Sequence, residues 1–277
     1  MSLEERTAPS STAGRGPAHH KEILIKMRNK KYTICRASAD VANIDIGAYC
    51  ADVTVAASDS DELYIEHSKS FALTLTERDG KICLHESKDP LWRLRHSEII
   101  VHVPACIVPD MNIRIFSGSI KIESGMYNDV QLSGKFVKAE IFNSTFENLT
   151  VKADELDVCA GGITVKNLAN ALAADGRVEF DKTFCKKAEC RVKKGNIGLC
   201  NSACDFAVLN SDEGNIAASV VGQESDYTIS LKGARVCGTN NHSSSGKCIK
   251  ARADRGSVVL DFNKAACLDE VFSELQA

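Results

Sequence analysis

The stretch Arg191–Ser219, RVKKGNIGLCNSACDFAVLNSDEGNIAAS, contains the tripeptide Gly-Asn-Ile twice, beginning at Gly195 and at Gly214. The two copies are nineteen residues apart, and Gly176 precedes Gly195 by the same interval. A repeat of about twenty residues is typical of solenoid proteins, in which each unit buries its apolar face only by stacking on its neighbours. The interval therefore predicts a stack of similar units.

The residues around these glycines alternate between apolar and polar, which indicates strands with one buried face. A glycine suits the corner between two such strands because it accepts a positive φ without Cβ strain. The predicted corner glycines are Gly118, Gly162, Gly176, Gly195, Gly214 and Gly256. The residues predicted to point inward after them are Ile120 and Ile122, Ile163 and Val165, Val178 and Phe180, Ile197 and Leu199, Ile216 and Ala218, and Val258 and Leu260.

The short repeat leaves no room for a helix in each unit, and the leucine pattern of leucine-rich repeats is absent. We therefore predict an all-β fold built as a parallel β-helix, a β-solenoid. Residues 109–262 would form the repeats, and residues 21–108 a hairpin-rich N-terminal β region and cap. Asp79-Gly80 lies between alternating segments and predicts a hairpin turn there.

The two ends of the chain differ from this pattern. Residues 1–20 are rich in small and polar residues and predict a disordered tail. Residues 263–277 predict a short amphipathic helix, because Leu268, Val271, Phe272 and Leu275 recur at helical spacing. One continuous domain is expected from about residue 21, and the helix would cover the last repeat or dock on a partner.

Composition excludes several classes of function. The 277 residues carry a formal net charge of -3, which gives no electrostatic drive toward nucleic acid. The apolar runs are too short for a transmembrane helix, and no secretory signal is seen, so a cytoplasmic location is expected. The protein is expected to be a monomer or a weak oligomer. The twelve cysteines include no Cys-x-x-Cys pair and are expected to be free thiols.

Several segments together resemble the bacterial putative-adhesin β-helix domains, a family of largely unknown function. The resemblance covers about residues 40–262 and is carried by the segments NIDIGAYCADVTVAASDSDELYIEHS, IIVHVPACIVPDMNIRIFSGSIKI, DYTISLKGARVCGTN and IKARADRGSVVLDF. It implies a right-handed β-helix and an adhesin-like role, and its members are often envelope-associated. It brings no established catalytic residues.

The loop SKDPLWRLRHSE is the candidate interaction surface. It holds Trp92 beside Arg93 and Arg95, a composition typical of interfaces. The alternative is that Trp92 covers the open end of the core. His67, His85 and His102 lack a carboxylate at ligand spacing and are expected to be isolated strand histidines.

Two cysteine pairs leave alternatives open. Stacked turns would bring Cys185 near Cys204, which allows a redox or metal cluster, whereas Cys190 is expected to be a buried hydrophobe. Cys237 and Cys248 flank a polar loop, and a disulfide between them would need an oxidising compartment.

No catalytic, cofactor-binding or metal motif stands out, so the sequence favours a non-catalytic binding or scaffolding module for an unknown protein or glycan. One alternative is a self-assembling structural protein. Another is a polysaccharide-active β-helix enzyme, which would need paired carboxylates. The acidic residues available for this are Asp154, Glu155, Asp175, Glu179 and Asp181, and they are scattered along the chain.

Overall fold

The computed structural model describes residues 22–23, 26–27, 30–36, 41–68, 73–86 and 96–263. Within these residues the fold is all-β and forms one fourteen-stranded, mostly parallel sheet. Its N-terminal strands are β1 (Glu22–Ile23), β2 (Lys26–Met27), β3 (Lys30–Arg36), β4 (Asn43–Ser58), β5 (Tyr64–Ser68), β6 (Leu73–Arg78), β7 (Lys81–Glu86) and β8 (Ser97–Pro104). The others are β9 (Asp110–Gly161), β10 (Thr164–Asp181), β11 (Phe184–Glu213), β12 (Ile216–Val221), β13 (Tyr227–Cys237) and β14 (Lys247–Asn263), with a 3-10 turn η2 at Glu224–Asp226.

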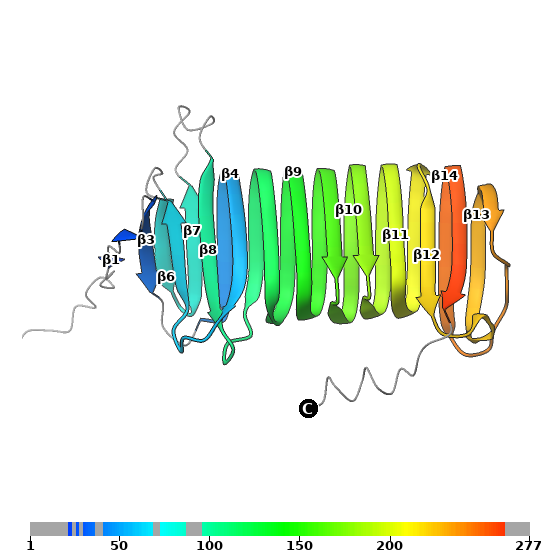
Figure 1. Cartoon of the computed structure of the whole chain (residues 1–277), viewed down its shortest axis with the longest axis horizontal. Coiled ribbons are helices and arrows are strands. Elements are labelled where there is room, and N and C mark those ends of the chain that lie inside the picture. Colours follow the sequence, from blue (N-terminus) through cyan, green and yellow to red (C-terminus); the bar gives the residue numbers. More distant parts are fainter. Residues whose placement is uncertain are drawn as a thin grey trace, which may run out of the picture.

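The strands lie side by side along the long axis of the molecule (Figure 1). Each turn pairs in parallel with the turn before it and the turn after it. Gly176 of β10, for example, pairs with Leu156 of β9 on one side and with Gly195 of β11 on the other. The offset between paired residues is therefore twenty and then nineteen, which confirms the period predicted from the Gly-Asn-Ile repeat.

The core runs through the inside of the stacked turns. Every residue predicted to point inward after a corner glycine is buried, and none exposes more than 7% of its surface. Cys190, predicted to act as a small hydrophobe, is fully buried in the same core. These rows of Ile, Val, Leu and Ala stabilise the fold because each turn removes the apolar face of its neighbour from water.

At the N-terminal end the sheet changes from parallel to antiparallel. β4 pairs in parallel with β9 on one side and with β7 and β8 on the other, so the parallel stack includes β4. β5 pairs antiparallel with β8 and β3. β6 and β7 form the hairpin expected at Asp79-Gly80, whose φ angles are 52° and 71°.

At the C-terminal end the strands do not follow the order of the chain. β14 lies between β12 and β13, although β13 precedes it in sequence. Residues 238–246 return along the outer edge of β13, where the backbone N–H of Ile229 donates to the carbonyl oxygen of Asn241 at 2.8 Å. The last turn is thereby partly covered by this loop.

Two expected segments lie outside the described residues. These are the tail at residues 1–20 and, beyond Asn263, the amphipathic helix with Leu268, Val271, Phe272 and Leu275. Asn263 itself is the last residue of β14. In the part of the chain that is described, no helix has the length and apolar character needed to cross a bilayer.

Candidate functional site

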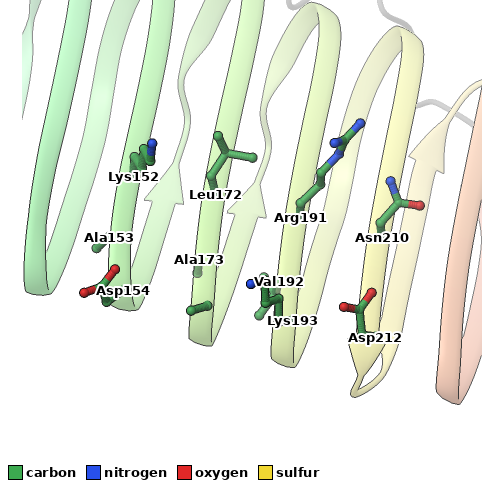
Figure 2. A pocket seen from close by; sticks show the side chains of 11 residues that line it. Lys152, Ala153, Asp154, Leu172, Ala173, Arg191, Val192, Lys193, Asn210 and Asp212 are labelled. Carbon is green, nitrogen blue, oxygen red and sulfur yellow. The ribbon is translucent and has the colours of Figure 1, made fainter.

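A groove with a volume of about 390 Å³ crosses four successive turns of the stack (Figure 2). It is lined by residues 152–154, 172–174 and 191–193 together with Asn210 and Asp212. Ala174, Lys193 and Asp212 each lie two residues before a corner glycine of their own turn. The same corner therefore shapes the groove in every turn, and its volume falls in the range of ligand pockets.

The floor of the groove is apolar because the residues stacked there are short. Ala173 pairs with Ala153 on one side and with Val192 on the other. Leu172 and Ala174 add apolar surface beside them. Ala153 and Val192 belong to the buried core and Ala173 packs against it, so strand backbone and short side chains form the floor between the two exposed rows.

The rim of the groove carries more cations than carboxylates. Lys152, Leu172, Arg191 and Asn210 form one row, one residue on each turn, and Lys193 lies between Asp154 and Asp212 in the other row (Figure 2). Lys152, Arg191 and Lys193 are exposed, and none of them has a salt-bridge partner among residues 96–263.

Some cations elsewhere on the stack are paired, although Lys186 and Lys194 of β11 also form no salt bridge among residues 96–263. Arg252 Nε lies 2.6 Å from Asp254 Oδ1, and Lys187 Nζ lies 2.6 Å from Glu189 Oε1. The three groove cations lie around one hollow, where they are available to hydrogen-bond an anionic ligand.

Four of the predicted corner glycines form one continuous ladder. A Cβ added to Gly176, Gly195, Gly214 or Gly256 would lie 1.7–1.9 Å from a carbonyl oxygen of the preceding turn. Gly256 follows Gly214 in this ladder, because β14 rather than β13 lies next to β12. The close backbone approach excludes any side chain at these positions.

The other two glycines lie elsewhere. A Cβ on Gly118, whose φ is 139°, would lie 2.0 Å from the carbonyl oxygen of Ala51, so this glycine forms the matching contact with β4. Gly162 does not belong to the ladder, which corrects the grouping made from the sequence. Its neighbour Gly161 pairs with Asp181, and Leu156 pairs with Gly176 at the corner. The GGITV segment thus marks a different corner of the turn.

The predicted interaction loop with Trp92, Arg93 and Arg95 lies outside the described residues. Apart from Asp154, the groove residues were not singled out from the sequence. Their side chains come from four turns, and the available signal was the fixed offset of two residues from each corner glycine. Among the enzyme candidates, Glu155 and Asp175 lie side by side on neighbouring turns, whereas Glu179 pairs with Arg177 and Asp181 accepts a hydrogen bond from Asn201 at 3.1 Å.

The stacking of Cys185 and Cys204 predicted from the turn length is confirmed. The two thiols are hydrogen-bonded, and that contact together with burial raises the pKa of Cys185. Burial also raises the pKa of Cys190 to about 12. Cys237 and Cys248 are free thiols, and Cys237 pairs with Val259, far along β14 from Cys248.

The expectation of isolated strand histidines is wrong for two of the three. The Nε2 atom of His102 lies 3.4 Å from Glu66 Oε1, and the ring stacks on Tyr64. His85 lies in a cluster with Asp45 and Cys83. The sequence concealed both contacts because the carboxylates Glu66 and Asp45 come from other strands.

A family model described as Toastrack DUF4097 matches residues 41–248, which include every strand that lines the groove. The chain belongs to this family. It is a family of unknown function with no known catalytic role, which agrees with the resemblance found in the sequence. No curated protein matches this chain.

Solved structures similar to this chain include three bacterial proteins. A "putative adhesin" from Bacteroides fragilis is 11% identical, with 85% of this chain and 98% of that chain covered and a TM-score of 0.43. A "putative lipid binding protein" from Parabacteroides distasonis is 15% identical over 84% and 95%, with a TM-score of 0.41. A "putative adhesin" from Parabacteroides merdae is 12% identical over 84% and 97%, with a TM-score of 0.35.

Proposed function

We propose that this chain is a non-catalytic binding module that holds an extended acidic polysaccharide along its groove. The observation that carries the proposal is the set of three unpaired cations, Lys152, Arg191 and Lys193, around one apolar hollow that crosses four turns. Successive turns of a sheet lie about 4.8 Å apart, so Lys152 and Arg191, which lie two turns apart in one row, are separated by about 10 Å along the rod. A chain-like ligand with repeated anionic groups fits this arrangement.

The charge at the groove is local. The chain as a whole has a net charge of -3, so nonspecific attraction to polyanions is weak. Binding would instead rely on direct contact with the rim cations and on burial of the ligand's carbon skeleton against Ala173 and Leu172. Exposed charge pairs are screened by salt, so affinity should fall as ionic strength rises.

The binding experiment uses the full chain and four probes. Polygalacturonate, hyaluronate and heparin are the acidic probes, and dextran is the neutral control. We expect binding to at least one acidic probe and none to dextran, with at least a tenfold loss in the variant Lys152→Gln/Arg191→Gln/Lys193→Gln. The matched control is Lys187→Gln, which removes a cation already paired with Glu189. The proposal is wrong if none of the acidic probes binds, or if both variants lose the same amount of affinity.

Self-assembly is less well supported, because both ends of the parallel stack are partly covered. Antiparallel β3 and β5 lie beyond β8, and residues 238–246 lie along β13. We therefore propose a monomer or weak oligomer, which light scattering would test. A polysaccharide-active enzyme is also less well supported, because Glu155 and Asp175, although neighbours, are exposed and do not line the groove.

We also infer that the coil is a right-handed β-solenoid. Connections between parallel strands of one sheet are almost always right-handed, because the twist of the strands favours that crossover. An experimental structure would test the hand directly, and a left-handed coil would contradict the inference.

A further inference from the structure

The outer face of β4 and β7 carries a cluster of three side chains that can bind a metal ion. Asp45 of β4 pairs with Cys83 of β7, and Gly47 pairs with His85, so both β7 side chains project on the same side of the strand. One ligand atom from each of Asp45, Cys83 and His85 lies within 4.8 Å of the other two. Asp45 is buried, Cys83 is half-buried and His85 is exposed.

Gly47 makes room for the imidazole in this cluster. A Cβ built on Gly47 would lie 2.5 Å from Nδ1 of His85 and 3.2 Å from its Cε1. The ring therefore occupies the space that a side chain on β4 would fill. This brings His85 toward the strand that carries Asp45, and any other residue at position 47 would push the ring away.

Asp45 is held in place by groups of the next strand. Arg114 Nη2 donates to Asp45 Oδ1 at 3.1 Å, and Asn112 Nδ2 donates to the same oxygen at 3.3 Å. Hydrogen bonds of this kind orient carboxylates that bind metals. The two oxygens of a carboxylate offer about four acceptor positions, so these donors leave room for a further bond.

Lys81 is the competitor for that bond. Its Nζ lies 3.3 Å from Asp45 Oδ2, but its side chain is 49% exposed and long enough to turn into solvent. A metal ion at the cluster would displace this ammonium group. Removal of the Lys81 charge should therefore strengthen metal binding rather than weaken it.

We propose that Asp45, Cys83 and His85 bind a Zn²⁺ ion. A thiolate, an imidazole and a carboxylate form a ligand set that Zn²⁺ accepts, and three protein ligands leave a fourth position for water. Bonds of about 2.0–2.3 Å place the ligand atoms of a tetrahedral site roughly 3.5 Å apart, so small side-chain movements suffice to bring atoms that lie within 4.8 Å of one another onto the ion. On binding, the Cys83 thiol gives its proton to solvent and its sulfur forms the bond to zinc.

The test uses the full chain, freed of metal by a chelator and titrated with Co²⁺ as a spectroscopic substitute for Zn²⁺. We expect one equivalent to produce a thiolate-to-cobalt charge-transfer band, which Zn²⁺ added afterwards abolishes. Cys83→Ser should remove the band, and His85→Gln should weaken Zn²⁺ binding at least tenfold. The control is Cys159→Ser, which removes an exposed thiol outside the cluster and should leave the band unchanged.

Two further variants separate a built site from adventitious thiol binding. Gly47→Ala keeps all three ligands but displaces the imidazole, so Zn²⁺ affinity should fall about tenfold. Lys81→Met should raise the affinity. If Cys83→Ser keeps the band, or if Gly47→Ala and Lys81→Met both bind as the unmodified chain does, the proposal is wrong. Circular dichroism of each variant shows that the fold is retained, and polysaccharide binding at the groove is an independent readout.

Discussion

Gly214 lies directly against Gly195 of the preceding turn, and a Cβ on Gly214 would lie 1.8 Å from the carbonyl oxygen of Gly195. The same contact joins Gly195 to Gly176, so the corner of each turn packs against the backbone of the preceding turn. No side chain fits into this contact. The two Gly-Asn-Ile copies are thus equivalent steps of one ladder.

Gly195→Ala should destabilise the fold by about 3 kcal/mol or more, because a positive φ and a backbone clash act together. Its φ is 135°, and its Cβ would lie 1.7 Å from the carbonyl oxygen of Gly176. Gly246→Ala is the matched control: its φ is also positive, at 83°, but nothing lies within 4 Å of its Cβ. We expect a loss of only about 1 kcal/mol there. Chemical denaturation measures both, and equal losses would contradict the ladder.

The asparagines after Gly195 and Gly214 link the turns as well. Asn196 Oδ1 accepts a hydrogen bond from the backbone N–H of Asn215 at 2.9 Å, and Asn215 Oδ1 accepts one from Ser257 at 2.9 Å. Asn215→Ala should cost about 0.5–1.5 kcal/mol, since it leaves the N–H of Ser257 without this partner. Exposed Gln223 caps nothing with its side chain, and Gln223→Ala should change the unfolding free energy by less than about 0.5 kcal/mol. Urea denaturation compares the two variants, and an equal effect would rule out the asparagine link.

The fold could be predicted largely because its signals are local in sequence. A corner glycine and the alternating residues after it, such as Ile197 and Leu199, specify a strand pair within one turn. Stacking then repeats that pair at a fixed interval. The order of the last strands was not predictable in this way, because the sequence does not show that β14 inserts between β12 and β13.

The candidate sites were much less predictable, because they are assembled from several turns. Lys152 and Arg191 share the groove although 39 residues separate them. Asp45 and Cys83 are neighbours only because β4 and β7 pair in parallel. Gly162 was misplaced for a different reason. The local sequence around it resembles that of a corner glycine, but in the strand register Leu156, not Gly162, pairs with Gly176.

The cysteines should differ strongly in reactivity. Cys106 and Cys237 are exposed, whereas Cys190 is fully buried and its pKa is raised to about 12 by burial. At pH 8 this reduces the thiolate fraction of Cys190 by about a thousandfold relative to an ordinary thiol. Iodoacetamide labelling followed by mass spectrometry should therefore modify Cys106 and Cys237 first, and Cys190 only after denaturation. Equal rates in the native protein would contradict the packed interior.

His102 should make the protein less stable in mild acid. Burial lowers the pKa of this imidazole, and nearby Glu66 opposes that effect only in part. Below about pH 6.5 the unfolded chain takes up a proton that the native state resists, so the unfolding free energy falls as the pH drops toward the lowered value. His102→Gln should reduce the change in unfolding free energy between pH 7.5 and pH 5. Denaturation curves at both pH values test this, and an unchanged dependence in the variant would exclude His102 as its source.

The most direct test of the binding proposal fills the groove without changing its charge. Ala174 is an exposed residue of the groove lining, and Ala217 is an exposed alanine of β12 outside it. Isothermal titration would measure the dissociation constant of the tightest-binding acidic polysaccharide for the unmodified chain, for Ala174→Trp and for Ala217→Trp. We predict at least a tenfold weaker affinity for Ala174→Trp and a change of less than about twofold for Ala217→Trp. Equal affinity in all three proteins would contradict binding in the groove.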